Sequence, residues 1–188
     1  MKEAAHLVLY SDMKLITITG LSGSGKDTVA RMLSEMMGIP VLCSYTTRPK
    51  RDGEEDGREH FFVKECNVPQ SEMLAYTKYG GYEYWTCVDQ IKGSAIYVID
   101  ENGIRELYLR VPDLQIIHVY VDAPLEVRRQ RGVAEERIAR DAARTPLSPK
   151  FYQYRLNNDF GSKMQLRTLV RTLFHDLKLL NFWHSDIG

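Results

Sequence analysis

The residues best suited to chemistry lie early in the chain, in the segment GLSGSGKDTVARML from Gly20 to Leu33. It fits the pattern Gly-x-x-x-x-Gly-Lys-[Ser/Thr] at every position except the last, where Asp27 stands. Gly20, Gly23 and Gly25 allow positive φ and leave room for an anion, so that backbone N–H groups and the start of a helix point at it. The segment therefore predicts a phosphate-binding loop between a strand and a helix, rather than a flexible surface turn.

The remaining loop residues suggest how a nucleotide would be held. Lys26 supplies a mobile charge for the outer phosphates. The hydroxyl that usually follows this lysine coordinates magnesium. Asp27 offers a hard oxygen ligand instead, which would hold the ion directly or through water, and Thr28 is the neighbouring hydroxyl. With Ser22 and Ser24 in the turn, we expect the whole loop to bind ATP and Mg²⁺.

A second anion site is indicated by the segment SYTTRPKRDGEEDGREHFFV, residues 44–63. Arg48 and Arg51 are spaced to grip a phosphate by charge-assisted hydrogen bonds. Without such a ligand, the same charges would form a solvated loop. The segment resembles the acceptor motif of the guanylate kinases, Ser-x-Thr-Thr-Arg-x-x-Arg-x-Gly-Glu-x-Asp-Gly. The resemblance extends from about Leu15 to the C-terminus.

This resemblance implies roles for several residues around that motif. Ser44 would contact the guanine, and the two arginines would hold the phosphate of GMP. In the second acceptor motif of the family, Tyr84 and Thr86 match. His60 stands where the family has a phosphate-binding tyrosine.

One base-reading residue of the family is missing. The glutamate that accepts hydrogen bonds from guanine falls on Ala75, and Glu72 and Glu83 are the nearby candidates to replace it. In YVIDENGI, Asp100 matches the second acid of the family segment Leu-Asp-Ile-Asp-x-x-Gly. It would orient magnesium-bound water or the acceptor, unless it simply caps the end of its strand.

The segment EVRRQRGVAEERIARDAAR, residues 126–144, is similar to the family lid, an Arg-Gly turn followed by Glu-Glu-x-Ile-x-x-Arg, with one residue deleted. Arg131 and Arg140 would act with Lys26 as catalytic groups that neutralise the transferring phosphoryl group. Arg128 and Arg144 are weaker candidates.

A second family shares features of the donor half. Ribose 1,5-bisphosphate phosphokinases carry Gly-Ser-Gly-Lys-Asp in the loop, Ala-Arg-x-Thr-Pro, and Leu-Asn-Asn-Asp; this chain has AARTP at 142–146 and LNND at 156–159. Asp27 is therefore compatible with catalysis. In RLNNDF, Asn157 would lie near the adenine of ATP, although a polar turn explains it as well.

These resemblances predict ATP-dependent phosphoryl transfer to a nucleoside monophosphate, with GMP as the first choice. The alternatives are a kinase for ribose 1,5-bisphosphate or another phosphorylated acceptor, and a non-catalytic binding module of guanylate-kinase type.

Composition narrows the class of protein. The 188 residues carry 25 basic and 25 acidic side chains, so nothing favours a nucleic-acid or membrane partner. Cys43, Cys66 and Cys87 form no C-x-x-C pair, and no apolar run approaches the roughly 20 residues of a membrane span. We find no signal peptide. We expect a cytoplasmic monomer or homodimer with reduced thiols and a small-molecule acceptor.

Alternating strands and helices predict an α/β fold with a doubly wound parallel sheet. The predicted strands are 15–19, 41–43, 95–100, 116–121 and 151–156; the predicted helices follow Lys26 up to Gly38, span 103–110 and 125–144 with a break at Gly132, and begin at Ser162 in a capping box with Gln165. The resemblance divides one domain, 13–188, into a phosphate-loop core (13–43, 89–125 and 146–188), an acceptor-binding insertion (44–88) and a short helical lid (126–145). Residues 1–12 are then an N-terminal extension.

Overall fold

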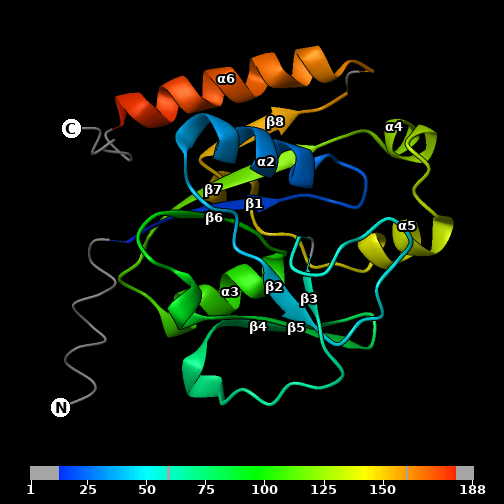
Figure 1. Ribbon diagram of the computed structural model, residues 1–188. Helices are drawn as coiled ribbons and strands as arrows, with labels where there is room; N and C mark the ends of the chain where they lie inside the picture. Colours follow the sequence, from blue (N-terminus) through cyan, green and yellow to red (C-terminus); the bar gives the residue numbers. More distant parts are fainter. Residues whose placement is uncertain (1–12, 59, 160, 181–188) are drawn as a thin grey trace.

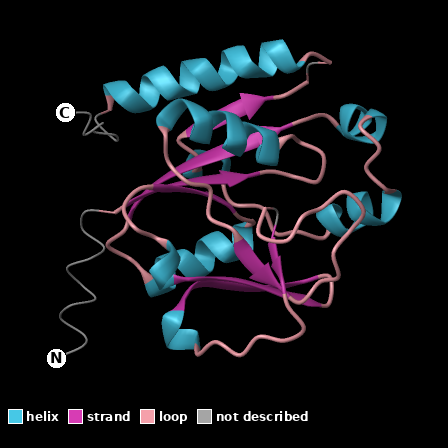
Figure 2. Ribbon diagram, in the orientation of Figure 1, coloured by secondary structure: helices cyan, strands magenta, loops and turns pink. Residues whose placement is uncertain are grey.

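The computed structural model describes residues 13–58, 60–159 and 161–180, and the predicted extension 1–12 lies outside them. The chain forms two sheets with helices between and around them (Figures 1 and 2). The strands are β1 (Lys14–Thr19), β2 (Ser44–Thr46), β3 (His60–Phe62), β4 (Met73–Tyr79), β5 (Tyr82–Cys87), β6 (Ala95–Val98), β7 (Gln115–Asp122) and β8 (Tyr154–Asn157). The α-helices are α2 (Lys26–Met37), α3 (Glu101–Arg110), α4 (Leu125–Gln130), α5 (Glu135–Ala142) and α6 (Lys163–Leu179); short 3₁₀ turns are η1 (Gln70–Glu72), η2 (Val88–Gln90) and η3 (Pro149–Phe151).

The first sheet is entirely parallel, in the order β6-β1-β7-β8. Its central strand β1 is buried on both faces because helices cover both sides. Ile16 and Ile18 pack in one apolar cluster with α2 and α6, whereas Leu15 packs in another with Ile104 and Leu107 of α3. The doubly wound parallel sheet that the sequence predicts is confirmed, and it presents the carboxyl ends of β1, β6 and β7 at a single edge.

The second sheet is mixed, in the order β3-β2-β5-β4. Helix α3 separates it from the first sheet (Figure 1), since Leu74 and Ala75 of β4 join the same apolar cluster as α3. Gly103 permits this close packing: a Cβ there would lie 3.3 Å from Thr77 and would collide with Ile99. The helix therefore fixes the distance between the two sheets.

Three predicted strands differ from the structure. The strand predicted over 95–100 ends at Val98, because Asp100 caps the helix that follows. Residues 41–43 do not form a strand: Val41 makes one isolated parallel bridge to Ile96, and β2 begins only at Ser44. The last strand begins at Tyr154 rather than 151, because the segment from Pro149 closes a 3₁₀ turn. Proline fixes φ and favours such a turn.

The predicted helices are close to those observed. The break at Gly132 is confirmed, since this glycine has φ +77° between α4 and α5. Ser162 caps α6 as predicted, but its hydroxyl accepts the N–H of Met164 and not that of Gln165. None of the helices in the described part of the chain combines the length and apolarity needed to cross a membrane.

A buried histidine on β7 yields a test of this packing. His118 is fully buried; Thr17 bonds its Nδ1 at 2.5 Å and Tyr108 its Nε2 at 2.8 Å. Burial lowers the pKa of His118 from 6.5 to about 4. Between these values the unfolded chain binds a proton that the folded chain does not, so folding loses stability as the pH falls from 6.5 to about 4.

We predict that His118→Gln removes this part of the acid sensitivity. The free energy of unfolding, measured by urea denaturation at several pH values, should differ less between variant and wild type at pH 4 than at pH 7. The difference in unfolding free energy between the two proteins should fall by up to about 3 kcal/mol between pH 7 and pH 4. The carboxylates titrate in both proteins, so their contribution to the unfolding free energy cancels in this comparison. A constant gap across this range would contradict the prediction.

Candidate active site

The predicted phosphate loop connects β1 to α2 and depends on its glycines. Gly23 has φ +75° and Gly25 has φ +94°. A Cβ on Gly23 would collide with Val133, and one on Gly25 would collide with Asn158. The turn is closed by a 3.1 Å hydrogen bond from the N–H of Ser24 to the carbonyl of Leu21. Side chains at these two glycines would therefore prevent both the turn and its close contact with Val133 and Asn158.

The loop carbonyls are held by side chains from two distant segments. The amide of Asn158 donates to the carbonyl of Ser24 at 2.7 Å. The guanidinium of Arg131 donates to the carbonyl of Gly23 at 2.9 Å and to that of Asn158 at 3.0 Å. These bonds engage oxygen atoms that would otherwise repel a phosphate. They place Arg131 at the base of the loop.

The asparagine beside the loop is not the one singled out from the sequence. Asn157 ends β8 with an exposed side chain, whereas Asn158 is buried against the loop. Residues along a strand alternate between its faces, so a shift of one position decides which asparagine reaches the site. The two adjacent asparagines indicate that one of them lies near the loop. Which of the two faces the loop does not follow from the sequence, because it depends on how the strand pairs with its neighbours.

Lys26 and Asp27 form the polar mouth of the loop. The ammonium of Lys26 lies 3.5 Å from the carboxylate of Asp27, and their side chains are 22% and 74% exposed. Lys26 lowers the pKa of Asp27, which keeps this carboxylate ionised. In the same loop, the hydroxyl of Ser24 is buried and has no hydrogen-bond partner among the residues that the structure describes. The loop thus combines charged groups with an unused hydroxyl, as expected of a site for a polar ligand.

The loop fits magnesium held together with a nucleotide better than magnesium held by protein alone. Among the described residues, no group of three or more His, Cys, Asp or Glu side chains could hold a metal. Asp27 and Thr28 supply one carboxylate and one hydroxyl. Mg²⁺ is commonly bound by one or two carboxylates, with substrate phosphates and water completing its coordination.

A buried carboxylate, Asp141, fastens the lid region to the loop. It accepts the N–H of Ser22 at 2.7 Å and the hydroxyl of Ser22 at 3.1 Å. Arg128, which is also buried, donates to Asp141 at 2.8 Å and to the carbonyl of Ser22 at 2.8 Å. Asp141 is not among the residues that the sequence predicts for the site. A lone Asp in a run of helical charges gave no sign that it would be buried.

A second ion pair continues this network to α3. Arg144 donates to the carboxylate of Glu101 at 2.8 Å and to the carbonyl of Gly20 at 3.2 Å. Glu101 is buried, and it too was missed because it opens a helix where acids are common on the surface. Arg128 and Arg144, the weaker candidates from the sequence, thus hold the backbone of the loop.

Arg48 and Arg51 lie in the loop that follows β2. Arg48 is 5% exposed, and its two terminal nitrogens each bond one oxygen of Glu54 at 2.9 Å. The backbone N–H of Arg51 also donates to Glu54, at 2.8 Å, while the Arg51 side chain is 41% exposed. Glu54 therefore orders both arginines and leaves the guanidinium of Arg51 accessible.

Four of the other predicted acceptor residues, Ser44, His60, Tyr84 and Thr86, share one face of the second sheet, whereas Asp100 lies at the start of α3. Ser44 bonds the Nδ1 atom of His60 at 2.8 Å, and the rings of His60 and Tyr84 are 5.7 Å apart. Thr86 donates to the hydroxyl of Tyr97 at 3.0 Å. Asp100 caps α3 by accepting the N–H of Gly103 at 2.8 Å.

The missing base-reading carboxylate is not restored by a neighbour on this face. Ala75 lies opposite Thr86 and is 1% exposed within the apolar cluster. Glu83 is one residue from Tyr84, so its side chain lies on the opposite face, where it accepts from the hydroxyl of Tyr76 at 2.6 Å. Glu72 is exposed in η1, before β4 begins.

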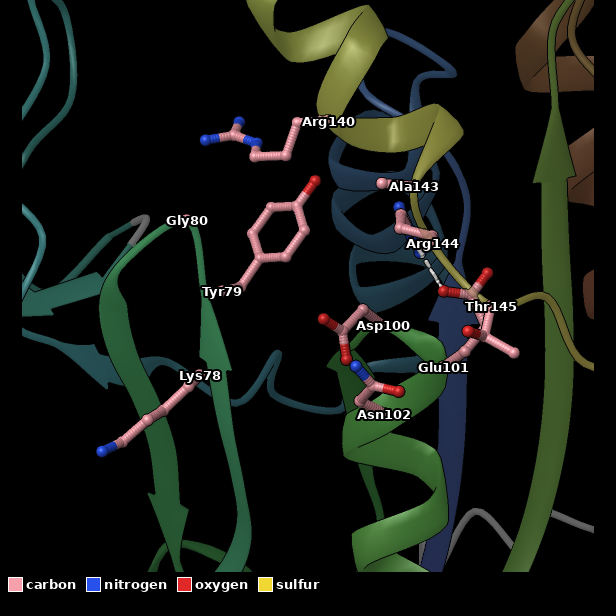
Figure 3. A pocket seen from close by; sticks show the side chains of 10 residues that line it. All are labelled: Lys78, Tyr79, Gly80, Asp100, Glu101, Asn102, Arg140, Ala143, Arg144 and Thr145. Atoms are coloured by element: carbon pink, nitrogen blue, oxygen red, sulfur yellow. Dashed lines mark hydrogen bonds and ion pairs between the residues drawn. The ribbon is translucent and has the colours of Figure 1, made fainter.

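Helix α5, which belongs to the predicted lid, reaches the tip of the β4–β5 hairpin (Figure 3). The guanidinium of Arg140 lies 4.7 Å over the ring of Tyr79, whose hydroxyl bonds Asp141 at 3.3 Å. A pocket of about 240 Å³ opens between this contact and the start of α3. A second pocket, of about 390 Å³, lies beside the loop and is lined by Gly25, Thr28, Arg131, Asn158 and Ser162.

Comparisons with known proteins agree with this geometry. Residues 12–155 match the family described as guanylate kinase. The chain is 36% identical over 149 residues to a guanylate kinase of Symbiobacterium thermophilum, covering 70% of each protein. It is 29% identical to one of Thermobifida fusca, over 87% of this chain and 86% of that protein. In fold, it resembles a guanylate kinase crystal structure from Anaplasma phagocytophilum with a TM-score of 0.64 and 20% identity, over 92% of this chain and 88% of that one.

A phosphate loop on a parallel sheet, together with these relatives, defines a phosphotransferase of the nucleoside monophosphate kinase class. The chain belongs to the guanylate kinase family.

We predict that Asp141→Asn strongly destabilises the protein. The substitution keeps the shape of the side chain but leaves Arg128 buried without a counter-charge, which costs about 3–5 kcal/mol. Urea denaturation at pH 7 measures the loss. Asp113→Asn removes an exposed carboxylate and should change stability by less than about 0.5 kcal/mol. Equal stabilities of the two variants would rule out the proposed importance of the network.

Proposed function

We propose that the protein transfers the γ-phosphoryl group of ATP to GMP, forming ADP and GDP. One observation carries this proposal: an anion site of backbone and lysine lies opposite an anion site of arginines. Asp141 links the two sides, because it accepts the N–H of Ser22 in the loop at 2.7 Å and the hydroxyl of Tyr79 in the second sheet at 3.3 Å. The guanylate kinase relatives support GMP as the acceptor.

In this proposal ATP occupies the loop from Gly20 to Thr28. Lys26 contacts its β and γ phosphates, and the pocket lined by Arg131 and Asn158 takes the adenosine end. Asn158 thus assumes the role first expected of Asn157. Mg²⁺, held by Asp27 and Thr28, would neutralise charge on the transferring phosphates.

GMP would occupy the inner face of residues 44–88. Arg48, Arg51 and Tyr84 would hold its phosphate, with His60 in place of the family tyrosine. Ser44, Thr86 and the free carboxylate oxygen of Asp100 would contact the guanine, which leaves the position of Ala75 without a polar partner.

Transfer itself needs no covalent bond to the protein. Two phosphates held in line, with charge neutralised by Lys26 and Arg140 and with water excluded by residues 126–145 as a lid, suffice for phosphoryl transfer. The Arg140 stack on Tyr79 supports this assignment of the lid, because the helix already reaches the acceptor half.

We predict that GMP and ATP are converted to GDP and ADP. A coupled ADP-release assay with a panel of nucleoside monophosphates and phosphorylated sugars should give the highest kcat/KM for GMP. Lys26→Ala should lower kcat at least about 100-fold, because a charge that stabilises the transition state is lost. The exposed Lys178→Ala is the matched control. Turnover of another acceptor but not of GMP would overturn the guanine assignment.

We predict that Asp27 sets the magnesium requirement. Asp27→Asn removes the negative ligand, so the Mg²⁺ concentration for half-maximal activity should rise about 10-fold or more. Asp27→Ser places the usual hydroxyl there and should restore much of the affinity. Activity is measured by Mg²⁺ titration after removal of metal with EDTA. An unchanged titration in Asp27→Asn would exclude this carboxylate as a ligand.

A further inference from the structure

Arg137 belongs to the lid helix α5 but has no role in the site described so far. It stands at the open position of the family pattern Glu-Glu-x-Ile-x-x-Arg, so the resemblance assigns nothing to it. Its side chain is half-buried, and its Nε atom is buried without a hydrogen-bond partner within residues 13–58, 60–159 and 161–180. A guanidinium nitrogen shielded from water normally has a partner, which points to a group that binds there.

The helix geometry directs this side chain toward the acceptor half. Arg140 and Asp141 both contact Tyr79 of the second sheet. Arg137 precedes them by three and four residues, and residues at these spacings share one face of a helix. In Figure 1, α5 lies beside the loop that follows β2 and carries Arg48 and Arg51.

The guanidinium groups of α5 and of the loop that follows β2 carry charges of the same sign. Burial lowers the pKa of Arg51, and the positive charges of Arg48 and Arg137 lower it further. Glu54 is the nearby carboxylate; both of its oxygens bond Arg48, and the guanidinium of Arg51 lies 3.8 Å from one of them. Guanidinium groups gathered around one occupied carboxylate form a site for an anion with more than one charge.

We propose that Arg137 is the third guanidinium of the acceptor-phosphate site, supplied by the lid. The phosphate of the acceptor would bridge Arg51 and Arg137 and so offset the repulsion between them. Lid closure would then depend on an occupied acceptor site, which limits transfer of the phosphoryl group to water. Arg140 keeps its proposed role at the transferring phosphoryl group, and Arg131 remains bonded to the loop. GMP as the particular acceptor rests on the proposed function.

The test compares Arg137→Ala with Arg171→Ala, which removes the same charge from the exposed surface of α6. We expect Arg137→Ala to raise the KM for GMP about 10- to 100-fold, the loss of a charge-assisted hydrogen bond, while the KM for ATP changes less than about threefold. Arg137→Lys should recover part of the affinity, because it restores the charge but not the two-pronged geometry. The melting temperature of each variant monitors folding.

Calorimetric titration of inorganic phosphate, with a non-hydrolysable ATP analogue occupying the loop, separates this inference from the choice of GMP. Weaker phosphate binding by Arg137→Ala than by Arg171→Ala supports the site even if GMP is not a substrate. Equal phosphate affinities and equal KM values for the acceptor would overturn it. A rise in the KM for ATP alone would also overturn it, because Arg137 would then serve the donor.

Discussion

The structure depends on one interaction, the buried carboxylate of Asp141 against the N–H and hydroxyl of Ser22. The loop that would hold a nucleotide is a turn of small residues with few side chains of its own to support it. Its shape is therefore maintained from outside, by Asp141 and Arg128 on one side and by Asn158 and Arg131 on the other. Because Asp141 lies on α5, the same contact anchors this helix to the loop after β1.

Tyr79 extends this contact to the second sheet. Its hydroxyl bonds Asp141 while its ring supports Arg140, so one turn of helix contacts both the loop and the hairpin. Meanwhile α3 keeps the two sheets at a set distance by close packing at Gly103. The separation of the glycine-rich loop from the arginines after β2 thus follows from apolar packing.

The acceptor half departs from its family at two linked places. His60, in place of a tyrosine, bonds Ser44, and Ala75 replaces the glutamate that would face guanine. Both changes affect the same inner face, and the nearest acidic side chains of β5 and η1 do not return a carboxylate to it. Base recognition by hydroxyls and Asp100 would have fewer charged contacts than the family pattern implies.

The sequence alone determined the glycine-rich loop between β1 and α2, the parallel core and the family, because these follow from local features: glycines at set spacing, a lysine before a helix, and apolar runs of strand length. It also placed the break at Gly132, since a positive φ is a local property. Strand boundaries near Val41 and Phe151 were wrong because pairing with neighbours, and not propensity, decided them. Only the tertiary structure selected Asn158 over Asn157, moved Arg131 to the loop, and buried Asp141, Glu101 and Ala75. The burial and pairing of a charge depend on segments about 40 to 120 residues away, which no short pattern records.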